Sequence, residues 1–550
     1  MNAILRHLVV LPILIPLVAG AALFFIAEAR RAARISIAVV SMASQLVVAI
    51  ALLYLTSDAA PYIWPDGVGV YAIGGWPAPF GIVLVVDRLT AVMLTLGGIV
   101  SLSTLVYSIA RWDRPGQPFH SLFQFLTMGL NGAFLTGDLF NLFVFFEILL
   151  AASYGMLLRG AGGPRVKFGL HYIAVNLAAS LLFLIGVALI YGTAGTLNMA
   201  DLAGRAAALP ADERALLDAG AAILGIAFLV KAGSWPLNFW LPGAYSAAMA
   251  PVAAAFALMT KVGFYAILRI GTLIQEYETL GAALLYMGIL TLVASTIGML
   301  AAKHLARLVA FTVLMSMGIL LGSLGLRIEA LTAPVMFYLI VSVLTTCTFF
   351  MVAGMTGRTR VADEPAAPEA EEESDTAVPG YQAYGIKKFS VYELADEAGV
   401  AIPAVMAFLG MMFVCCVLLV SGLPPFSGFL AKFALLATML DPVHDVGGSS
   451  ASWILSATIV ASGLVSVVAL SRIGTRLFWS VAARTTPRLR LLEAAPVAAL
   501  VLLCLGLSVA ADPVMRYLDS AAKSLHQPDT YIRAVLSQQT LREQRGAPSP

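Results

Sequence analysis

The chain contains 550 residues, of which 60% are hydrophobic and only 12% are charged, and its mean hydropathy is +0.90. These values exclude a soluble multidomain protein and indicate that much of the chain lies in lipid. The apolar runs are long and uninterrupted, whereas a membrane barrel would show strands of roughly ten residues with alternating polarity. The sequence therefore predicts spanning α-helices, and its net charge of +2 gives no indication of nucleic-acid binding.

The apolar runs predict an all-α membrane protein with about fourteen transmembrane helices, each of roughly 20 residues, because the hydrocarbon core of a bilayer is ~30 Å thick. The first run resembles a signal peptide, but its length and the arginines that follow it favour an uncleaved span. In chain order, the predicted spans are 8–27, 35–56, 88–110, 119–136, 138–158, 169–192, 219–240, 246–270, 279–300, 303–325, 331–355, 402–438, 452–480 and 491–511.

Basic residues recur in alternate loops between these spans. By the positive-inside rule the basic loops face the cytoplasm, and the intervening loops, which carry mostly Asp and Glu, face the periplasm. An even number of spans then places both termini in the periplasm. The basic loop residues are Arg30, Arg31, Arg34, Arg111, Arg114, Arg159, Arg165, Lys167, Arg358, Arg360, Arg484, Arg488 and Arg490.

Two stretches lack the pattern of a membrane span. Residues 357–398 have an acidic core rich in Pro, Ala and Glu and too few apolar residues to fold alone, which predicts a disordered cytoplasmic loop. The tail after residue 511 is polar, and its residues 517–541 are compatible with an amphipathic helix on the membrane surface.

Glu147 is the first of four ionisable residues that lie well inside predicted spans. A charge there costs at least ~2.5–3.5 kcal/mol and therefore needs a reason. Glu147 stands in GDLFNLFVFFEILLAASYGM, ~13 Å along its helix from Asp138 and close to the midplane. The functional interpretation is a proton carrier, and the alternative is a carboxylate that only fixes helix packing through a hydrogen bond.

Lys231 precedes Pro236 and Pro242, which are expected to break its helix because proline removes a backbone hydrogen bond and clashes with the preceding turn. Broken helices in lipid are tolerated where protein covers them or where they line a wet cavity. The proton affinity of a lysine at such a break can be tuned by its surroundings, which suits a proton carrier. The alternative is a lysine that snorkels to the interface. Lys261 lies in the next span, also far from either end.

Lys432 repeats this arrangement in the second half of the chain, near a break at Pro424 and Pro425. Two Pro-interrupted spans in corresponding positions of two halves are typical of inverted-repeat transporters, with the working site at the breaks. The alternative is coincidence between two proline-containing spans. Lys303 and His304 begin the tenth span and are further candidates for the relay, although charges at a helix end commonly contact headgroups.

Other chemistry has no support in the sequence. It contains no glycine-rich phosphate loop, no clustered Cys/His set for a metal and no nucleophile–base pair. We therefore expect no cofactor, no bound metal and no enzymatic activity of this chain alone. Transport would be driven by ion gradients or by partner subunits.

Four segments carry a resemblance to a known family: TGDLFNLFVFFEILLAASYG (136–155), YGTAGTLNMADLA (191–203), LVKAGSWPLNFWLPGAYSAAMAPVAA (229–254) and LPPFSGFLAKF (423–433). They resemble the D-type subunit of the Mrp/Pha/Mnh-type multisubunit monovalent cation (Na+ or K+)/proton antiporters, which is similar to the antiporter-like proton-channel subunits of respiratory complex I. The resemblance covers nearly the whole chain. It implies two inverted five-helix repeats, each with a broken helix.

The resemblance also implies roles for the buried residues. Glu147 would partner Lys231, Lys261 would connect two half-channels, and Lys432 would end the second. The lysine that the family usually carries early in the tenth span aligns with Ala306, so the link between the halves would run through Lys303, His304 or water. The implied division is residues 1–117 (first three spans), 118–272 (first repeat), 273–482 (second repeat, with the loop 357–398) and 483–550 (last span and tail).

The function implied is proton translocation within a heteromeric antiporter that exchanges Na+ or K+ for protons across a bacterial inner membrane. Its expected partners are the other antiporter subunits, the transported ions and the lipid bilayer. Two alternatives stay open. One is a proton-pumping subunit of NADH-quinone oxidoreductase or a membrane-bound hydrogenase, and the other is a structural scaffold whose buried charges only hold partners together.

Overall fold

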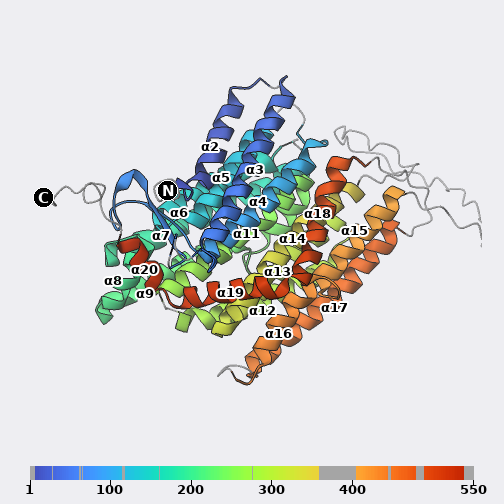
Figure 1. Cartoon of the computed structure of the whole chain (residues 1–550). Coiled ribbons are helices and arrows are strands. Elements are labelled where there is room, and N and C mark those ends of the chain that lie inside the picture. The colour runs from blue at the N-terminus through green and yellow to red at the C-terminus, as the bar shows by residue number, and fades with distance from the viewer. Residues whose placement is uncertain are drawn as a thin grey trace, which may run out of the picture.

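The computed structural model describes residues 7–27, 29–60, 63–64, 66–113, 118–159, 162–274, 277–357, 404–443, 448–478 and 489–537. Within these ranges the chain is a bundle of helices (Figure 1), twelve of which are long and apolar enough to cross a membrane. Two further apolar helices are shorter. The all-α membrane fold is confirmed, while the count of fourteen spans stays a prediction.

The helices follow the predicted spans, with the predicted span 402–438 divided into two helices. In chain order the elements are α2 (Leu11–Phe24), α3 (Arg31–Leu55), β1 (Gly69–Ala72), η1 (Ile73–Gly75), β2 (Val83–Val86), α4 (Arg88–Ile109), α5 (Phe119–Leu135), α6 (Leu139–Leu157), α7 (Gly163–Ala194), α8 (Met199–Ala208), α9 (Ala211–Ala232), α10 (Trp240–Ala247), α11 (Ala250–Ile274), α12 (Tyr277–Ala301), α13 (Leu305–Gly325), η2 (Glu329–Leu331), α14 (Thr332–Thr356), α15 (Ala404–Ser421), α16 (Ser427–Leu440), α17 (Ser450–Phe478), α18 (Leu491–Val509), α19 (Ala511–His526) and α20 (Asp529–Leu536).

A short β-hairpin, which we did not predict from the sequence, connects α3 to α4. Strands β1 and β2 pair antiparallel, with Gly69 opposite Val86. The four residues of β2 are Val-Leu-Val-Val and all are buried, and such a run of mostly β-branched side chains favours extended backbone. The strand is followed by Asp87, whose carboxylate accepts the N–H of Thr90 at 2.9 Å and so caps the start of α4.

Helices α11, α13 and α14 form the centre of the bundle. Their apolar stretches are buried almost all round, whereas α3, α7 and α17 each expose an apolar face. A helix that is buried on every side is surrounded by other helices, and an exposed apolar face borders lipid or a partner.

Glycines allow helices α12 and α13 to pack closely. A Cβ on Gly288 of α12 would lie 2.3 Å from the backbone N of Gly322 on α13.

The two breaks predicted from proline have the same backbone geometry. Helix α9 ends before Gly233, which has φ 73°, and the N–H of Ser234 donates to the Leu229 carbonyl at 3.0 Å. Helix α15 ends before Gly422, which has φ 77°, and the N–H of Leu423 donates to the Leu418 carbonyl at 2.9 Å. Glycine reaches this left-handed conformation without steric cost, so each helix stops at its glycine and the next residue closes the last turn.

The prolines act next to these glycines. Pro236 lies in the connection between α9 and α10, and Pro424 and Pro425 lie in the connection between α15 and α16. The predicted helix break at Pro242 is wrong, because Pro242 occupies the first turn of α10 and does not interrupt a helix. A proline is tolerated in a first turn, where its missing N–H would have no partner within the helix.

The described basic loops meet at one face of the bundle. Arg31, after α2, forms a 2.8 Å ion pair with Asp113, which follows α4. Burial would raise the pKa of Asp113, but hydrogen bonds from His120 and Arg31 hold it below its usual value. Arg490, just before α18, donates to the Ala110 carbonyl. These contacts bring three predicted cytoplasmic loops together.

Both ends of the described chain lie at the opposite face. His7 packs against Tyr71 of β1 with a ring separation of 5.5 Å, and α20 packs against the same strand. Helix α19 runs across the ends of the spans at this face (Figure 1), with contacts to α14, α11 and α4. Its apolar residues Leu518 and Leu525 are buried, as a surface helix with one apolar face requires. The single amphipathic helix predicted over 517–541 is, among the described residues, two helices: α19 ends at His526, and α20 runs from Asp529 to Leu536.

A buried ion pair, which we did not predict from the sequence, joins α4 to α11. The guanidinium of Arg269 makes two hydrogen bonds of 2.6 Å to Asp87 and a third of 3.2 Å to Thr90. The rings of Tyr265 and Tyr531 lie 5.6 and 5.3 Å from the guanidinium. Because Tyr531 belongs to α20, this cluster connects the C-terminal helices to the centre of the bundle.

Asp87→Asn should destabilise the protein by ~3–5 kcal/mol, because it leaves the Arg269 charge buried and uncompensated. Asp58→Asn is the control, since Asp58 pairs with Arg88 through a side chain that is 78% exposed and such pairs contribute little. Apparent melting temperature in detergent, followed by size-exclusion chromatography, measures both variants. Equal melting temperatures for the two variants would contradict the role of the Asp87–Arg269 pair.

Candidate functional site

Glu147 and Lys231 lie on either side of one serine hydroxyl. Ser180 of α7 donates to the Glu147 carboxylate, and the Lys231 ammonium donates to the Ser180 oxygen at 3.2 Å. Lys231 and Ser180 are buried, and Glu147 is half-buried. The residues predicted as partners are therefore close together, and Ser180 joins them.

The local sequence explains the position of Lys231. It occupies the last turn of α9, two residues before Gly233, where the helix stops. Its ammonium lies 4.9 Å from the centre of the Phe146 ring, and cations are attracted to the face of an aromatic ring. Phe146 precedes Glu147 on α6, so one helix supplies both the aromatic face and the carboxylate near this lysine.

Lys261 connects the central helices α11 and α13. Its side chain is 1% exposed, and its ammonium donates to the Ser316 hydroxyl at 2.5 Å. Ser316 in turn donates to the Val313 carbonyl one turn earlier on α13. Lys261 thus reaches from the predicted first repeat into the predicted second one.

Lys432 reaches back across the second break. It lies on α16, and its ammonium donates to the carbonyls of Val420 and Ser421 at 2.9 and 3.1 Å. These carbonyls belong to the last turn of α15, where the helix leaves acceptors without intrahelical partners. Lys231 precedes its break and Lys432 follows its break, so the two lysines are not at matching positions along the chain.

A small cavity lies between the partners of Lys261 and Lys432. It has a volume of about 20 Å³ and is enclosed by α13, α14, α15 and α16. Ser316, which binds Lys261, and Val420, which binds Lys432, both line it. Thr312, Ser342 and Thr345 are among its other lining residues, and each hydroxyl donates to a carbonyl of its own helix. A cavity of this size has room for about one water molecule, which would lie between the partners of the two lysines.

The residues at the start of the tenth span are not part of this group. Lys303 and His304 lie in the connection between α12 and α13, and both are exposed. The structure therefore places them at the face of the basic loops, away from the buried lysines. Among the described residues, no group of three His, Cys, Asp or Glu side chains is placed to hold a metal ion.

Comparison with known proteins shows the family. The profile of a family described as NADH:quinone oxidoreductase/Mrp antiporter, TM, matches residues 136–370. A Rhizobium meliloti (strain 1021) protein, named as the D subunit of a probable K(+)/H(+) antiporter, is 48% identical over 97% of this chain and 98% of its own length. The chain belongs to the family of antiporter D subunits. The corresponding D subunit of the Na(+)/H(+) antiporter of Alkalihalophilus pseudofirmus is 32% identical, over 97% of this chain and all of the relative.

Solved structures have the same fold as this member of the antiporter family. A chain of the Mrp complex from Dietzia sp. DQ12-45-1b superimposes with a TM-score of 0.78 at 25% identity, covering 96% of this chain and 99% of that one. A chain of respiratory complex I from Thermus thermophilus gives a TM-score of 0.73 at 20% identity, covering 94% and 99%. At 20% identity, the similarity to the complex I chain shows a shared fold and nothing about function.

The buried groups of this antiporter subunit make hydrogen bonds of the kind that proton transfer requires. A serine hydroxyl both donates and accepts, so Ser180 can receive a proton from Lys231 and give its own proton to Glu147. Ser316 offers Lys261 the same chemistry. The two serines were missed in the sequence, because a serine in a span commonly bonds to its own helix and only the packing of neighbouring helices shows its partner.

Gly422→Ala tests whether the position of Lys432 matters. The left-handed backbone makes the change unfavourable by ~1–2 kcal/mol, and the added Cβ would lie 2.6 Å from Cδ of Lys432. Gly448→Ala is a matched control, since Gly448 has φ 73° and no neighbouring atom within 4 Å. Both variants should melt earlier, but only Gly422→Ala should slow cation-dependent proton transport in everted membrane vesicles. Equal transport by the two variants would contradict the hypothesis that transport depends on the position of Lys432.

Proposed function

We propose that this chain is the proton-translocating subunit of a multisubunit K+ or Na+/proton antiporter. The observation that carries the proposal is the Glu147–Ser180–Lys231 group, in which a carboxylate and an ammonium share a hydroxyl beside a broken helix. A charge inside a membrane is expensive and is usually retained for function. Family membership supports the same conclusion.

In the proposed path, protons move between Lys231, Lys261 and Lys432 through hydroxyl groups and water. Glu147 stabilises the proton on Lys231 when the two are joined through Ser180, and separation of the pair releases that proton onward. The contact between Lys261 and Ser316 supports a link between the proposed repeats 118–272 and 273–482. Lys432 and the carbonyls of α15 form the last part of this path.

The names of the relatives supply candidate cations. The relative at 48% identity is named for K+, and the one at 32% is named for Na+. The higher identity favours K+ for this chain.

We place the chain in a bacterial inner membrane within a heteromeric complex. The face that gathers Arg31 and Arg490 is assigned to the cytoplasm by the positive-inside rule, so both termini and α19 face the periplasm. The exposed apolar faces of α3, α7 and α17 supply the surfaces for lipid and neighbouring subunits.

Replacement of the first relay pair tests the proposal. Glu147→Ala and Lys231→Ala in the assembled complex should each reduce cation-dependent proton transport ~10²-fold or more, the contribution of a positioned proton-transfer group. Lys231→Arg should fail as well, because a guanidinium stays protonated at all working pH values. Fluorescence of a pH-sensitive dye in everted vesicles, with K+ or Na+ added, measures the rate.

Lys167→Ala is the matched control, since Lys167 is exposed at the start of α7. Copurification of the tagged chain with its partner subunits establishes that each variant assembles. Normal transport by assembled Lys231→Ala complexes would refute the proton-path proposal and leave the scaffold interpretation. Recovery of quinone or nickel–iron modules with the tagged chain would instead support a redox-driven pump.

A further inference from the structure

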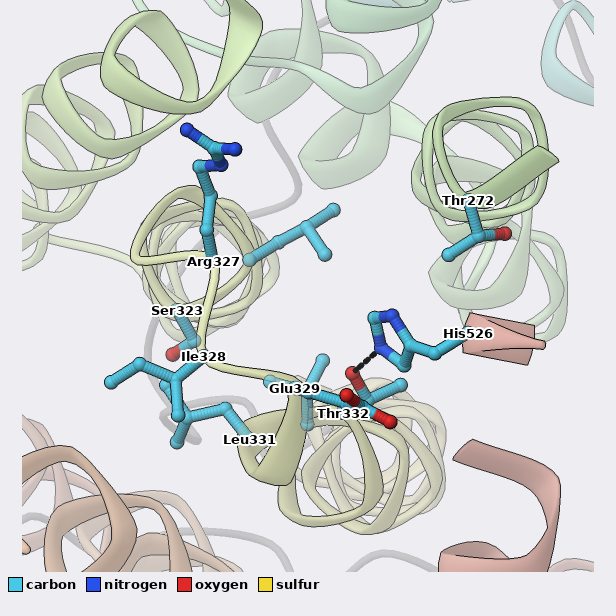
Figure 2. Close-up of a pocket in the computed structure, with 10 residues that line it drawn as sticks. Thr272, Ser323, Arg327, Ile328, Glu329, Leu331, Thr332 and His526 are labelled. Atoms are coloured by element: carbon cyan, nitrogen blue, oxygen red, sulfur yellow. Dashed lines mark hydrogen bonds between the residues drawn. The ribbon is translucent and has the colours of Figure 1, made fainter. Parts of the chain in front are cut away.

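A cavity of about 310 Å³ opens at the face of the bundle that carries the chain ends. It lies between the end of α11, the connection from α13 to α14 and the end of α19 (Figure 2). Its volume exceeds that of the small cavity near Lys432 more than tenfold, so it has room for several water molecules. The polar residues of its lining are Thr272, Ser323, Arg327, Glu329, Thr332 and His526.

His526 is the titratable residue that joins α19 to this cavity. Its Nε2 lies 2.8 Å from the Thr332 hydroxyl at the start of α14 (Figure 2). Burial lowers the pKa of His526, and the nearby Glu329 carboxylate acts in the opposite direction. The imidazole is therefore mainly neutral at pH 7, yet it can gain a proton and release it again.

The groups around His526 come from several elements. Glu329 on η2 carries the facing negative charge, and the guanidinium of Arg327 points away from the imidazole in Figure 2. Helices α11 and α14 contribute the hydroxyls of Thr272 and Thr332. The other charged groups near this end of α19 are Lys523 one turn earlier, Asp529 at the start of α20, and Arg88 of α4, which donates to the Ser520 carbonyl.

Two serines on one face of α13 lie at the cavity and at the buried relay. Ser323 lines the cavity, is 1% exposed, and its hydroxyl has no partner among the described residues. Ser316, which binds Lys261, lies seven residues earlier, so it shares the same helix face about 10.5 Å away. Thr312 continues this face, and both Thr312 and Ser316 line the small cavity near Lys432.

We propose that the large cavity is the outer mouth of the proton path, and that His526 exchanges protons between this path and the water outside. This inference rests on the proposed function and adds the route by which protons enter or leave at the face of the chain ends. The lining suits proton exchange better than a K+ or Na+ site, because the guanidinium of Arg327 offsets the single carboxylate of Glu329 and leaves no net negative charge to hold a metal cation.

His526→Gln removes the titratable group and keeps a side chain that can bond to Thr332. In the assembled complex it should slow cation-dependent proton transport at least about tenfold, less than the ~10²-fold effect of a positioned group in an enzyme because water replaces part of the transfer. Thr332→Val is the structural control, since it removes the hydrogen bond and keeps the imidazole. It should retain most of the transport. His171→Gln, at an exposed site on α7, should behave like the wild type.

The outcomes separate this inference from the proposed function. Normal transport by His526→Gln, or an equal loss in Thr332→Val, would overturn the role of His526 as a proton-exchange residue. If Lys231→Ala abolishes transport while His526→Gln does not, only the outer-mouth inference fails. If neither variant affects transport, the proposed function fails as well. Slower transport by His526→Gln alone, in complexes that retain all subunits, supports the inference.

Discussion

A helix that ends inside a membrane leaves backbone groups that water does not reach, and the site in this chain depends on how those groups are satisfied. At the first break, the chain closes its own last turn at Gly233, and Thr291 of α12 accepts the N–H of Trp235 at 2.8 Å. At the second break, the carbonyls of Val420 and Ser421 accept the ammonium of Lys432. Each break therefore persists only because neighbouring groups are placed to complete it.

The same contacts determine how stable a charge is at each lysine. Insertion of a charged side chain costs at least ~2.5–3.5 kcal/mol, and a hydrogen bond to a charged group contributes ~1.5–3 kcal/mol. Lys432 makes two such bonds, so the free energy they contribute is similar to the cost of inserting its charge. Lys261 has one hydroxyl partner, so a smaller part of the cost of its buried charge is offset. Protonated and neutral lysines of similar free energy are what a proton path needs, because a carrier that holds its proton too firmly stops transport.

The sequence predicted the parts of this arrangement that depend on local pattern. Apolar runs predicted the helices, prolines predicted the breaks, and the cost of buried charge identified Glu147 and the three lysines. The pairing of Glu147 with Lys231 came from the family resemblance, and the serine that joins them was not predictable because it depends on helix packing. Ser180 and Lys231 are 51 residues apart. A pattern shows which residues share a face of one helix, but it does not show which neighbouring helix lies against that face.

Asp87 and Arg269 were missed for a related reason. Each lies near the end of a span, where a charge is ordinarily assigned to the interface. Their bidentate contact is buried because β2 and α20 cover that end of the bundle, and neither element was predicted there as a cover. Lys303 and His304 show the opposite case, since their helix end is uncovered and both side chains are exposed. Whether a charged residue near the end of a span is buried thus depends on the segments that cover that end of the bundle.

The two halves are better compared through their break glycines than through their lysines. Lys231 lies two residues before Gly233, whereas Lys432 lies ten residues after Gly422. The Lys432 ammonium nevertheless binds the carbonyl of Val420, which lies two residues before Gly422. Each break therefore has a lysine at the last turn of its first helix: Lys231 belongs to that turn, and Lys432 contacts that turn from the far side of the break. A proton path requires an ionisable group near each break, and this requirement leaves the sequence position of each lysine free to differ.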